Sequence, residues 1–210
     1  MDARLIHDDD SECATHQPRS CDAQWLFAYG SLVAQCPRTL TRNQRRDGVI
    51  ADLPGYRRTW GVAMDNRVDI AGYKYYVDPD TGVRPDVRVA FLDLAPDPGH
   101  VVNGVCRPVT WGQLHEFDTR ERQYLRVDVS SAFSGIDATV WTYIGSPSGR
   151  QRRTDGDRTG TTVVARAYRD TVLAGFEGLG RDEYAAFVSS TSECGCPVIP
   201  LVRHDLLDVR

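Results

Sequence analysis

Residues 110–124 read TWGQLHEFDTRERQY, and the rest of the fold can be built outward from this stretch. Thr110 is followed three positions later by Gln113. This is a capping-box pair, in which each side chain satisfies an unpaired backbone N–H of the first helical turn. The apolar residues that follow recur at helical spacing. The stretch therefore predicts an amphipathic helix that begins just after Thr110.

Glu121 is the residue of this helix that needs an explanation. At about 100° per residue, Leu114 and Phe117 define the buried stripe, Glu121 falls between them, and Tyr124 lies beside Phe117. A desolvated carboxylate is costly unless it is paired, and burial raises its pKa toward the range useful for proton transfer. Two interpretations stay open on helix geometry alone. Either Glu121 pairs with an arginine at the rim of the helix face, or it is a general acid/base in a cleft.

Length and charge limit the class of protein. A chain of 210 residues is long enough for one domain with a sizeable core. Its net charge of −4 gives no support for nucleic acid or an anionic membrane as a partner. No run approaches the roughly 18 apolar residues of a membrane span. The acidic residues 8–12 stand where a secretory signal needs a basic and then an apolar segment, so we expect a cytoplasmic protein.

The chain has six cysteines, too few for a disulfide scaffold of this length, and a cytosolic protein would keep them reduced. Cys194 and Cys196, with His204, have the only spacing that suggests a metal. They lack a second cysteine pair, so two ordinary thiols are expected there. The sequence has neither a G-x-G-x-x-G nor a Walker A motif. We therefore expect no metal and no organic cofactor.

Outside residues 110–124, the chain divides into an extension and one domain. Residues 1–23 are polar and acidic, which predicts a disordered or loosely held N-terminal extension before a single domain at 24–210. Residues 146–160 are rich in Gly, Ser and Arg without apolar anchors, which predicts a mobile loop. Helices are predicted at 163–176 and 181–190. Strand patterns occur at 25–29, 48–64, 72–77, 87–94, 101–109, 125–130 and 139–144.

This order of elements is neither a regular βαβ alternation nor an all-β sandwich. Short strands dominate, with one helix inserted in the middle of the chain and two helices at its end. The sequence therefore predicts an α+β fold, in which a mixed sheet curls toward a small β-barrel and helices pack on it.

Tyr29-Gly30-Ser31-Leu32 is a second local signal, at the point where the first predicted strand ends. A glycine-containing turn can present successive backbone N–H groups to a carboxylate or a developing oxyanion. Taken alone, the motif is better explained as a plain strand-to-loop glycine. A cysteine hydrolase built from Cys36 or Cys106 with a histidine also stays open, although no spacing supports it.

Two longer motifs change this balance: FAYGSL at 27–32 and FDxxExxYxR at 117–126. Their order and spacing resemble the γ-glutamylcyclotransferase-like superfamily, which includes γ-glutamylcyclotransferases, γ-glutamylamine cyclotransferases and ChaC-type glutathione-degrading enzymes. Shorter matches support the resemblance at 53–57, 102–105 and 168–187. It extends over roughly residues 25–192.

The resemblance implies a small mixed β-barrel with flanking helices and an enzyme that releases 5-oxoproline and a free amine from a γ-glutamyl amide. It implies Glu121 as the general acid/base and no cofactor. The residues it assigns to substrate binding are Tyr29, Gly30, Ser31, Leu32, Tyr124 and, more weakly, Tyr143. Asp118 would orient the turn or helix instead of reacting.

Several points stay open after the resemblance. The substrate is one of glutathione, a γ-glutamyl amino acid, a γ-glutamylamine or a biosynthetic intermediate, and the protein is expected as a monomer or homodimer. The arginines of 150–158 would bias the leaving group toward an acidic amine if they border the site; otherwise they are simply solvated. The alternative function is a non-catalytic module that binds γ-glutamyl ligands.

Overall fold

The computed structural model describes residues 23–43 and 47–206, so nearly all of the predicted extension at 1–23 lies outside the described part. The described part holds nine strands and four α-helices. The strands are β1 (Gln24–Ala28), β2 (Val49–Asp65), β3 (Lys74–Val77), β4 (Arg88–Val109), β5 (Tyr124–Asp128), β6 (Thr139–Gly145), β7 (Thr162–Ala165), β8 (Val198–Ile199) and β9 (Val202–Asp205). The α-helices are α1 (Trp111–Arg120), α2 (Pro147–Thr159), α3 (Arg166–Leu179) and α4 (Arg181–Ser190).

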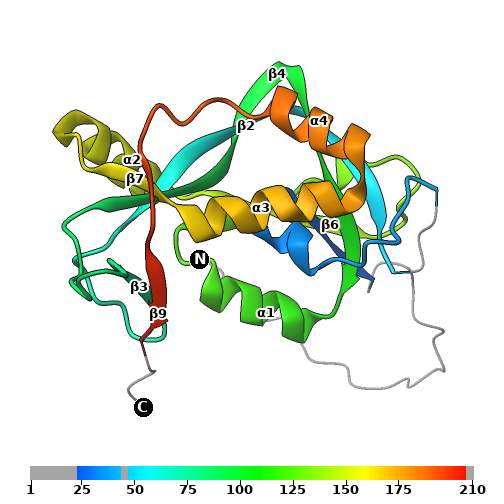
Figure 1. Cartoon of the computed structure of the whole chain (residues 1–210). Helices are drawn as coiled ribbons and strands as arrows, with labels where there is room; N and C mark the ends of the chain where they lie inside the picture. Colours follow the sequence, from blue (N-terminus) through cyan, green and yellow to red (C-terminus); the bar gives the residue numbers. More distant parts are fainter. Residues whose placement is uncertain (1–22, 44–46, 207–210) are drawn as a thin grey trace, which may run out of the picture.

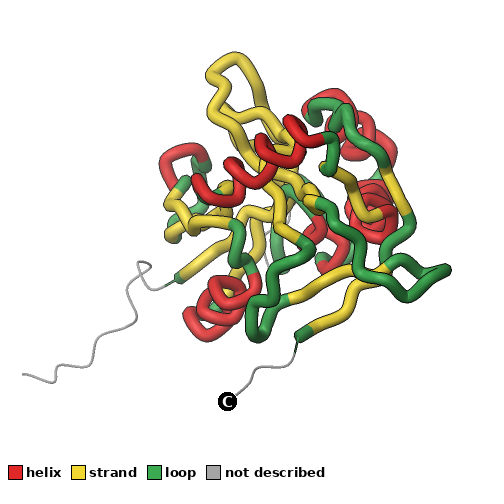
Figure 2. The backbone as a smooth tube through the Cα atoms, turned by 90° about the vertical axis from the view of Figure 1, so that its left-hand side faces the viewer, coloured by secondary structure: helices red, strands yellow, loops and turns green. Residues whose placement is uncertain are grey.

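The main sheet is mixed, and its strand order is β5-β6-β1-β4-β7-β8, with β2 also paired to β4. Strand β1 lies between β6, to which it is parallel, and β4, to which it is antiparallel. The sheet curls, and the helices lie around it (Figures 1 and 2). A separate ribbon of β3 and β9 lies at one end of the molecule, near the C-terminus (Figure 1). The predicted α+β class, a curled mixed sheet with flanking helices, is confirmed.

Strands β2 and β4 form one long antiparallel pair. The predicted strand at 48–64 agrees with β2, whereas β4 joins the strands predicted at 87–94 and 101–109 into one. The register shifts between Pro54 and Tyr56 inside β2. Gly55 has a φ of 82°, so it absorbs the extra residue as a bulge without ending the strand.

Helix α3 packs directly on a short 3₁₀ helix, η2 (Ser31–Gln35), that follows β1. A Cβ at Gly175 of α3 would lie 2.8 Å from the backbone nitrogen of Ala34, closer than side chains approach. Only glycine permits this approach. The turn that carries the FAYGSL motif is therefore fixed between β1 and α3.

The predicted mobile loop at 146–160 is wrong, because these residues form helix α2 (Figure 1). Ser146 caps the helix by accepting a hydrogen bond from the Gly149 N–H at 3.0 Å, and Pro147 occupies its first turn. Gly160 ends it in the left-handed conformation, with a φ of 67°. The chain thus has the start and stop signals of a helix.

Helix α2 lacks an apolar stripe because it packs through glycines and arginines. A Cβ at Gly149 would lie 2.4 Å from Val62 Cγ2, so the helix backbone touches β2 directly. Arg150 Nε donates to the buried carboxylate of Asp93 at 2.7 Å. Arg153 Nε donates to the Trp60 carbonyl at 2.7 Å. These contacts hold α2 in place without an apolar face, and the sequence-based prediction recognised helices by such a face.

Replacing Arg150 by glutamine is expected to lower the free energy of unfolding by about 1–3 kcal/mol, because buried Asp93 loses its counter-ion. Chemical denaturation of the variant measures the change. Arg158→Gln is the matched control on the same helix, since the Arg158 side chain is 77% exposed. The control should change by less than about 0.5 kcal/mol. Equal stability of the two variants would show that the Arg150–Asp93 pair does not anchor α2.

The expectation that all six cysteines are reduced thiols is wrong for two of them. Cys194 and Cys196 form a disulfide, so this pair has no free thiolate for a metal. Cys36 and Cys106 are free and buried. Within the described residues, no helix is long and apolar enough to cross a bilayer.

Candidate active site

Helix α1 is capped as predicted. The Thr110 N–H donates to Gln113 Oε1 at 2.9 Å, and the Gln113 N–H donates to Thr110 Oγ1 at 3.2 Å. Leu114 and Phe117 are buried. The prediction that Glu121 lies within the helix needs correction, because α1 ends at Arg120.

Glu121 is the C-cap residue, and its N–H still donates to the Phe117 carbonyl at 2.8 Å. Its half-buried side chain therefore leaves the helix at its end and lines a cavity. Tyr124 lies in β5 and not in the helix. The chain turns tightly between them, since the Tyr124 N–H donates to the Glu121 carbonyl at 2.9 Å.

The turn after β1 is closed by the Val33 N–H, which donates to the Gly30 carbonyl at 3.0 Å. The N–H groups of Ser31 and Leu32 lie at the start of this 3₁₀ turn, where they have no acceptor within the helix itself. Tyr29 fixes the other side of the turn, because its hydroxyl donates to the Tyr143 carbonyl at 2.7 Å.

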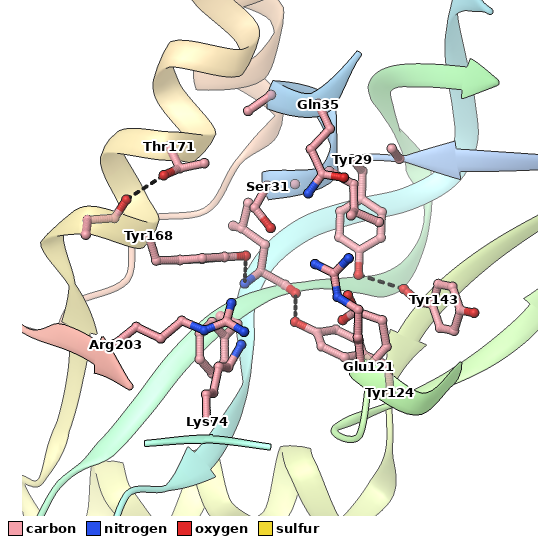
Figure 3. Close-up of a pocket in the computed structure, with 18 of the residues that line it drawn as sticks. Tyr29, Ser31, Gln35, Lys74, Glu121, Tyr124, Tyr143, Tyr168, Thr171 and Arg203 are labelled. Carbon is pink, nitrogen blue, oxygen red and sulfur yellow. Dashed lines mark hydrogen bonds between the residues drawn. The ribbon is translucent and has the colours of Figure 1, made fainter. Parts of the chain in front are cut away.

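One cavity of about 320 Å³ brings these elements together. All seven residues predicted for the site line it: Tyr29, Gly30, Ser31, Leu32, Glu121, Tyr124 and Tyr143. They come from the end of β1, the start of η2, the end of α1 and the strands β5 and β6. Figure 3 shows Tyr29, Ser31, Glu121 and Tyr124 around a common space, whereas the Tyr143 ring points away from it. Their proposed roles remain predictions.

A set of tyrosines forms one wall of the cavity around Leu92 of β4. The Tyr124 hydroxyl donates to the Leu92 carbonyl at 2.7 Å, and the Leu92 N–H donates to the Tyr168 hydroxyl at 3.3 Å. The β2–β4 register shifts between Thr59 and Val62, opposite this part of β4. Burial raises the pKa of both tyrosines, so they are neutral hydrogen-bonding groups at neutral pH.

Tyr143 connects this cavity to helix α1. Its hydroxyl donates to Asp118 Oδ1 at 2.8 Å, and the other carboxylate oxygen of Asp118 lies 3.4 Å from Arg126 Nη1. Asp118 does not line the cavity. Its contacts agree with the orienting role expected for it.

Glu121 is the acid among the described residues that line the cavity, and the cations among them are Lys74, Arg120 and Arg203. Burial raises the pKa of its carboxyl group, and Lys74, Arg120 and Arg203 oppose this rise without cancelling it. Burial lowers the pKa of Lys74 to about 8, while the charge of Glu121 acts in the opposite direction. The cavity therefore contains an acid and an amine whose pKa values both shift toward neutrality.

Sequence reasoning missed the cations of this site. Lys74 and Arg203 point into the cavity from β3 and β9 (Figure 3). The Lys74 ammonium lies 4.3 Å from the centre of the Phe91 ring. A signal was available for Lys74, since it interrupts an aromatic run, Tyr73-Lys74-Tyr75-Tyr76. Arg203 had no local signal, because its position depends on the pairing of β9 with β3.

The arginine-rich segment that was considered as a border of the site does not line the cavity. The cysteine-hydrolase alternative has no support either. Cys36 and Cys106 are absent from the cavity lining, and burial raises the pKa of both thiols, opposite to the shift that a nucleophilic cysteine needs. No cluster of three or more metal-binding side chains occurs in the described part of the chain.

Comparisons with known proteins find similarity in structure. No protein-family model and no curated protein matches the chain. A structure described as a gamma-glutamyl cyclotransferase has a TM-score of 0.46 and 12% identity, over 84% of this chain and 94% of that one. An uncharacterised human protein has a TM-score of 0.45 and 13% identity, over 85% and 94%.

A third similar structure is a yeast gamma-glutamyl cyclotransferase specific to glutathione, with a TM-score of 0.39 and 14% identity. That comparison covers 75% of this chain and 97% of the yeast chain. The chemistry of the cavity is inferred from its own residues and not from these TM-scores. Two of these three similar structures are described as gamma-glutamyl cyclotransferases.

Proposed function

We propose that this protein is a γ-glutamyl cyclotransferase, which closes the glutamyl part of a γ-glutamyl amide into 5-oxoproline and releases the amine. One observation carries the proposal: the desolvated carboxyl group of Glu121 lines the same cavity as the turn at Gly30–Ser31–Leu32. A pure binding module gains little from a desolvated acid, because the burial of that charge only costs stability.

The chemistry assigns one proton-transfer group and no cofactor. The α-amino group of the substrate is mostly protonated at neutral pH, and the Glu121 carboxylate would accept that proton. The freed amine nitrogen attacks the γ-carbonyl carbon and forms the bond that closes a five-membered ring. The bond from that carbon to the leaving nitrogen then breaks as the Glu121 carboxyl returns its proton to that nitrogen. The ring nitrogen loses its second proton to the released amine, which departs as an ammonium group.

The reaction is intramolecular, so the protein has to hold the substrate in a folded conformation. Effective molarities of such ring closures reach ~10⁵ M or more. In this proposal, the N–H groups of Ser31 and Leu32 stabilise the oxyanion that develops on the γ-carbonyl oxygen. A Cβ at Gly30 would lie 3.6 Å from the Tyr168 hydroxyl, in space that a ligand can otherwise use.

The cations of the cavity favour a substrate whose leaving amine carries a carboxylate. Lys74 and Arg203 stand on neighbouring strands of the β3–β9 ribbon, and Lys74 forms no ion pair within 4.0 Å among the described residues. Arg203 pairs with Asp205 at 2.6 Å, and Arg120 is exposed, so among the described residues Lys74 is the half-buried cation of the cavity without an ion pair. We assign Lys74 to that carboxylate. A polyamine or another cationic leaving group would be repelled.

The assignment of Lys74 predicts a difference between two substrates with the same glutamyl part. For a γ-glutamyl amino acid, kcat/KM is expected to fall as pH rises through about 8, because Lys74 loses its proton there. A γ-glutamyl methylamide has no leaving-group carboxylate and should lack this fall. Titrations of Glu121 and of the substrate amine are common to both substrates and cancel in the ratio of their rates.

Lys74→Arg and Lys74→Ala complete this test. Arginine stays protonated over the whole range, so the ratio of the two substrates should become independent of pH. Alanine should lower kcat/KM for the amino-acid substrate by about 10–100-fold, the effect of one hydrogen bond to a charged group. A ratio that is unchanged by both variants would contradict the role of Lys74 and leave the cyclisation reaction itself untouched.

The proposed activity is tested by incubating the protein with a panel of γ-glutamyl compounds and measuring the release of 5-oxoproline. Glutathione, γ-glutamyl amino acids and γ-glutamylamines represent the alternatives. Thermal stabilisation by these compounds without any turnover would favour the non-catalytic module instead.

A further inference from the structure

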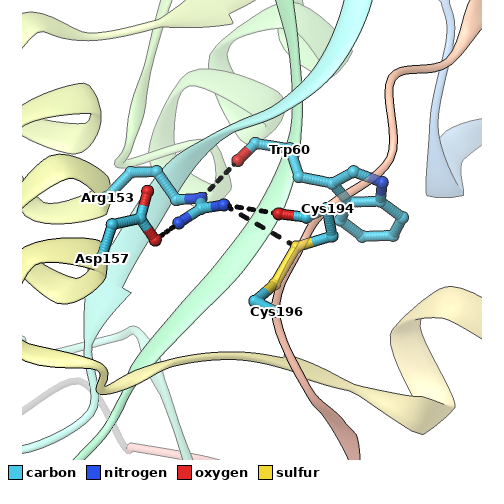
Figure 4. Close-up of a disulfide and its surroundings, with 5 residues drawn as sticks. All are labelled: Trp60, Arg153, Asp157, Cys194 and Cys196. Atoms are coloured by element: carbon cyan, nitrogen blue, oxygen red, sulfur yellow. Dashed lines mark hydrogen bonds and ion pairs between the residues drawn. A yellow bond between two sulfur atoms is a disulfide. The ribbon is translucent and has the colours of Figure 1, made fainter.

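The Cys194–Cys196 disulfide lies on the segment between α4 and β8 (Figure 4), and neither cysteine lines the cavity. Both cysteines are half-buried and line a hollow in the protein surface together with Trp60 and Arg169. A small molecule can therefore reach the sulfur atoms in the folded protein. This accessibility separates the pair from Cys36 and Cys106, which are buried.

The backbone is fixed on both sides of the disulfide. Before it, the Ser192 N–H donates to the Arg58 carbonyl at 2.9 Å. After it, the Val164 N–H donates to the Pro197 carbonyl at 2.8 Å. The residues between these two anchors can rearrange locally when the sulfur–sulfur bond opens. Opening the disulfide therefore does not require the sheet to move.

The two sulfur atoms have different surroundings, because Arg153 lies beside one of them (Figure 4). Its Nη2 donates to the Cys194 carbonyl at 3.0 Å and lies 3.8 Å from Cys194 Sγ. The guanidinium is held in place by the Trp60 carbonyl and by an ion pair with Asp157. Its side chain is only 12% exposed, so water screens its charge weakly.

Other charges near the hollow do not reproduce this arrangement. Arg169 lines the hollow, but it pairs with Asp170 at 3.0 Å. Glu193 lines the hollow too, but it is an exposed acid and not a cation. Asp157 offsets part of the charge of Arg153, and its own side chain is 51% exposed. Among the described residues, Arg153 is the fixed cation that contacts a sulfur atom of this pair, and the atom that it contacts is Cys194 Sγ.

We propose that Cys194 and Cys196 form a site for thiol–disulfide exchange with low-molecular-weight thiols. The thiolate of such a thiol attacks Cys196 Sγ and forms a mixed disulfide there. The Cys194–Cys196 bond breaks, and Cys194 leaves as a thiolate beside Arg153. A second thiol then releases the first one as a symmetric disulfide and leaves both cysteines reduced, so each added thiol loses one electron. The site is independent of the proposed cyclotransferase activity.

The direction of attack follows from the leaving group. Exchange is faster when the departing sulfur is the more stable thiolate, and a neighbouring guanidinium stabilises a thiolate. Arg153 stabilises the thiolate of Cys194 as it departs, whereas no cation among the described residues is in contact with Cys196 Sγ. The mixed disulfide is therefore formed on Cys196.

The test uses the full oxidised chain and reduced glutathione at millimolar concentration, without denaturant. After short incubation, free thiols are alkylated at acidic pH, and the position of glutathione is mapped by fragmentation mass spectrometry. The expected early species carries glutathione on Cys196 and the alkyl label on Cys194. Longer incubation should label both residues, while Cys36 and Cys106 stay unlabelled because they are buried and burial raises the pKa of their thiols.

Arg153→Gln is expected to slow the opening of the disulfide by about 3–10-fold, because the departing Cys194 thiolate loses its neighbouring cation. Arg169→Gln is the matched control, because it removes a cation from the same hollow that does not contact sulfur, and its rate should equal that of the unmodified protein. The site assignment in the unmodified chain tests the proposal even if Arg153→Gln fails to fold. Reduction that requires denaturant, or glutathione found mainly on Cys194, would overturn it.

Discussion

Replacing Glu121 by glutamine is expected to lower kcat/KM for 5-oxoproline release by about 10²–10⁴-fold, the usual contribution of a general acid/base. Glutamine keeps the shape of the side chain but cannot accept the proton of the substrate amine. Release of 5-oxoproline from the best compound of the panel measures the loss. Glu116→Gln is the matched control, because Glu116 is an exposed residue of the same helix, and its activity should be unchanged.

The same variant has an independent signature in stability. The pKa of Glu121 is raised in the folded protein because its carboxyl group is desolvated. The folded state therefore holds this proton more tightly than the unfolded state, and stability falls as pH rises from the unfolded pKa through the folded one. Glu121→Gln is expected to be more stable than the unmodified protein at neutral pH, and this gain should vanish in acid, where Glu121 is protonated.

The activity and the stability of Glu121→Gln together distinguish an incorrect mechanism from an incorrect assignment of Glu121 as a desolvated acid. Full activity in Glu121→Gln would refute the proposed mechanism. A variant without activity and without any gain in stability at neutral pH would show that the acid is not desolvated, as expected if an arginine paired with it at the protein surface. Loss of activity together with the pH-dependent gain fits only a desolvated acid that takes part in the reaction.

The parts of the site that were predictable from sequence are those with local signals. The capping box fixes the start of α1 through contacts between residues three apart, so Thr110 and Gln113 reveal it directly. The turn after β1 is also local, because the 3₁₀ hydrogen bond closes within four residues. The resemblance of both motifs to one family then placed Glu121 and this turn in a common site, and the structure puts them around one cavity.

The rest depends on contacts between residues far apart in the chain. Helix α2 was missed because its buried face consists of Gly149, Gly156 and arginines, and none of these contributes to an apolar period. Burial lowers the pKa of Lys74, and its strand β3 is held by pairing with β9, which lies near the end of the chain. The polar side chains of α2 hydrogen-bond to buried carbonyls and to a buried carboxylate. Such a helix has no apolar period, so hydrophobic periodicity cannot distinguish it from a solvated loop.

Arg58 is a further residue that sequence reasoning passed over, and it connects the turn of the site to the core. Its side chain is fully buried, with the guanidinium 4.9 Å and 4.6 Å from the ring centres of Phe176 and Phe187. Its Nε donates to the Tyr29 carbonyl at 2.9 Å, and its Nη2 donates to the Asn103 carbonyl. Burial lowers the pKa of Arg58 to about 9, so the group stays protonated at neutral pH.

Arg58→Met is expected to lower the free energy of unfolding by about 3–5 kcal/mol. Methionine fills part of the space between the aromatic rings, but it leaves the carbonyls of Tyr29 and Asn103 buried without donors, at about 1–3 kcal/mol each. Ser190 and Thr191 lose a donor at 2.9 Å and 3.1 Å as well. Removal of a costly buried charge offsets part of this loss. For a chain of this size the melting temperature should fall by roughly 10 °C.

The adjacent residue provides the matched control. Arg57 precedes Arg58 in β2 and points to the opposite face, where its side chain is 41% exposed and lies 3.2 Å from Asp97. Arg57→Met should change the free energy of unfolding by less than about 0.5 kcal/mol, as is usual for a partly exposed ion pair. If Arg57→Met and Arg58→Met have the same melting temperature, Arg58 stabilises the fold no more than an ordinary surface arginine does. A large loss confined to Arg58 means that one buried cation joins the Tyr29 turn, β4 and the end of α4, and so supports the turn whose amides we propose to bind the oxyanion.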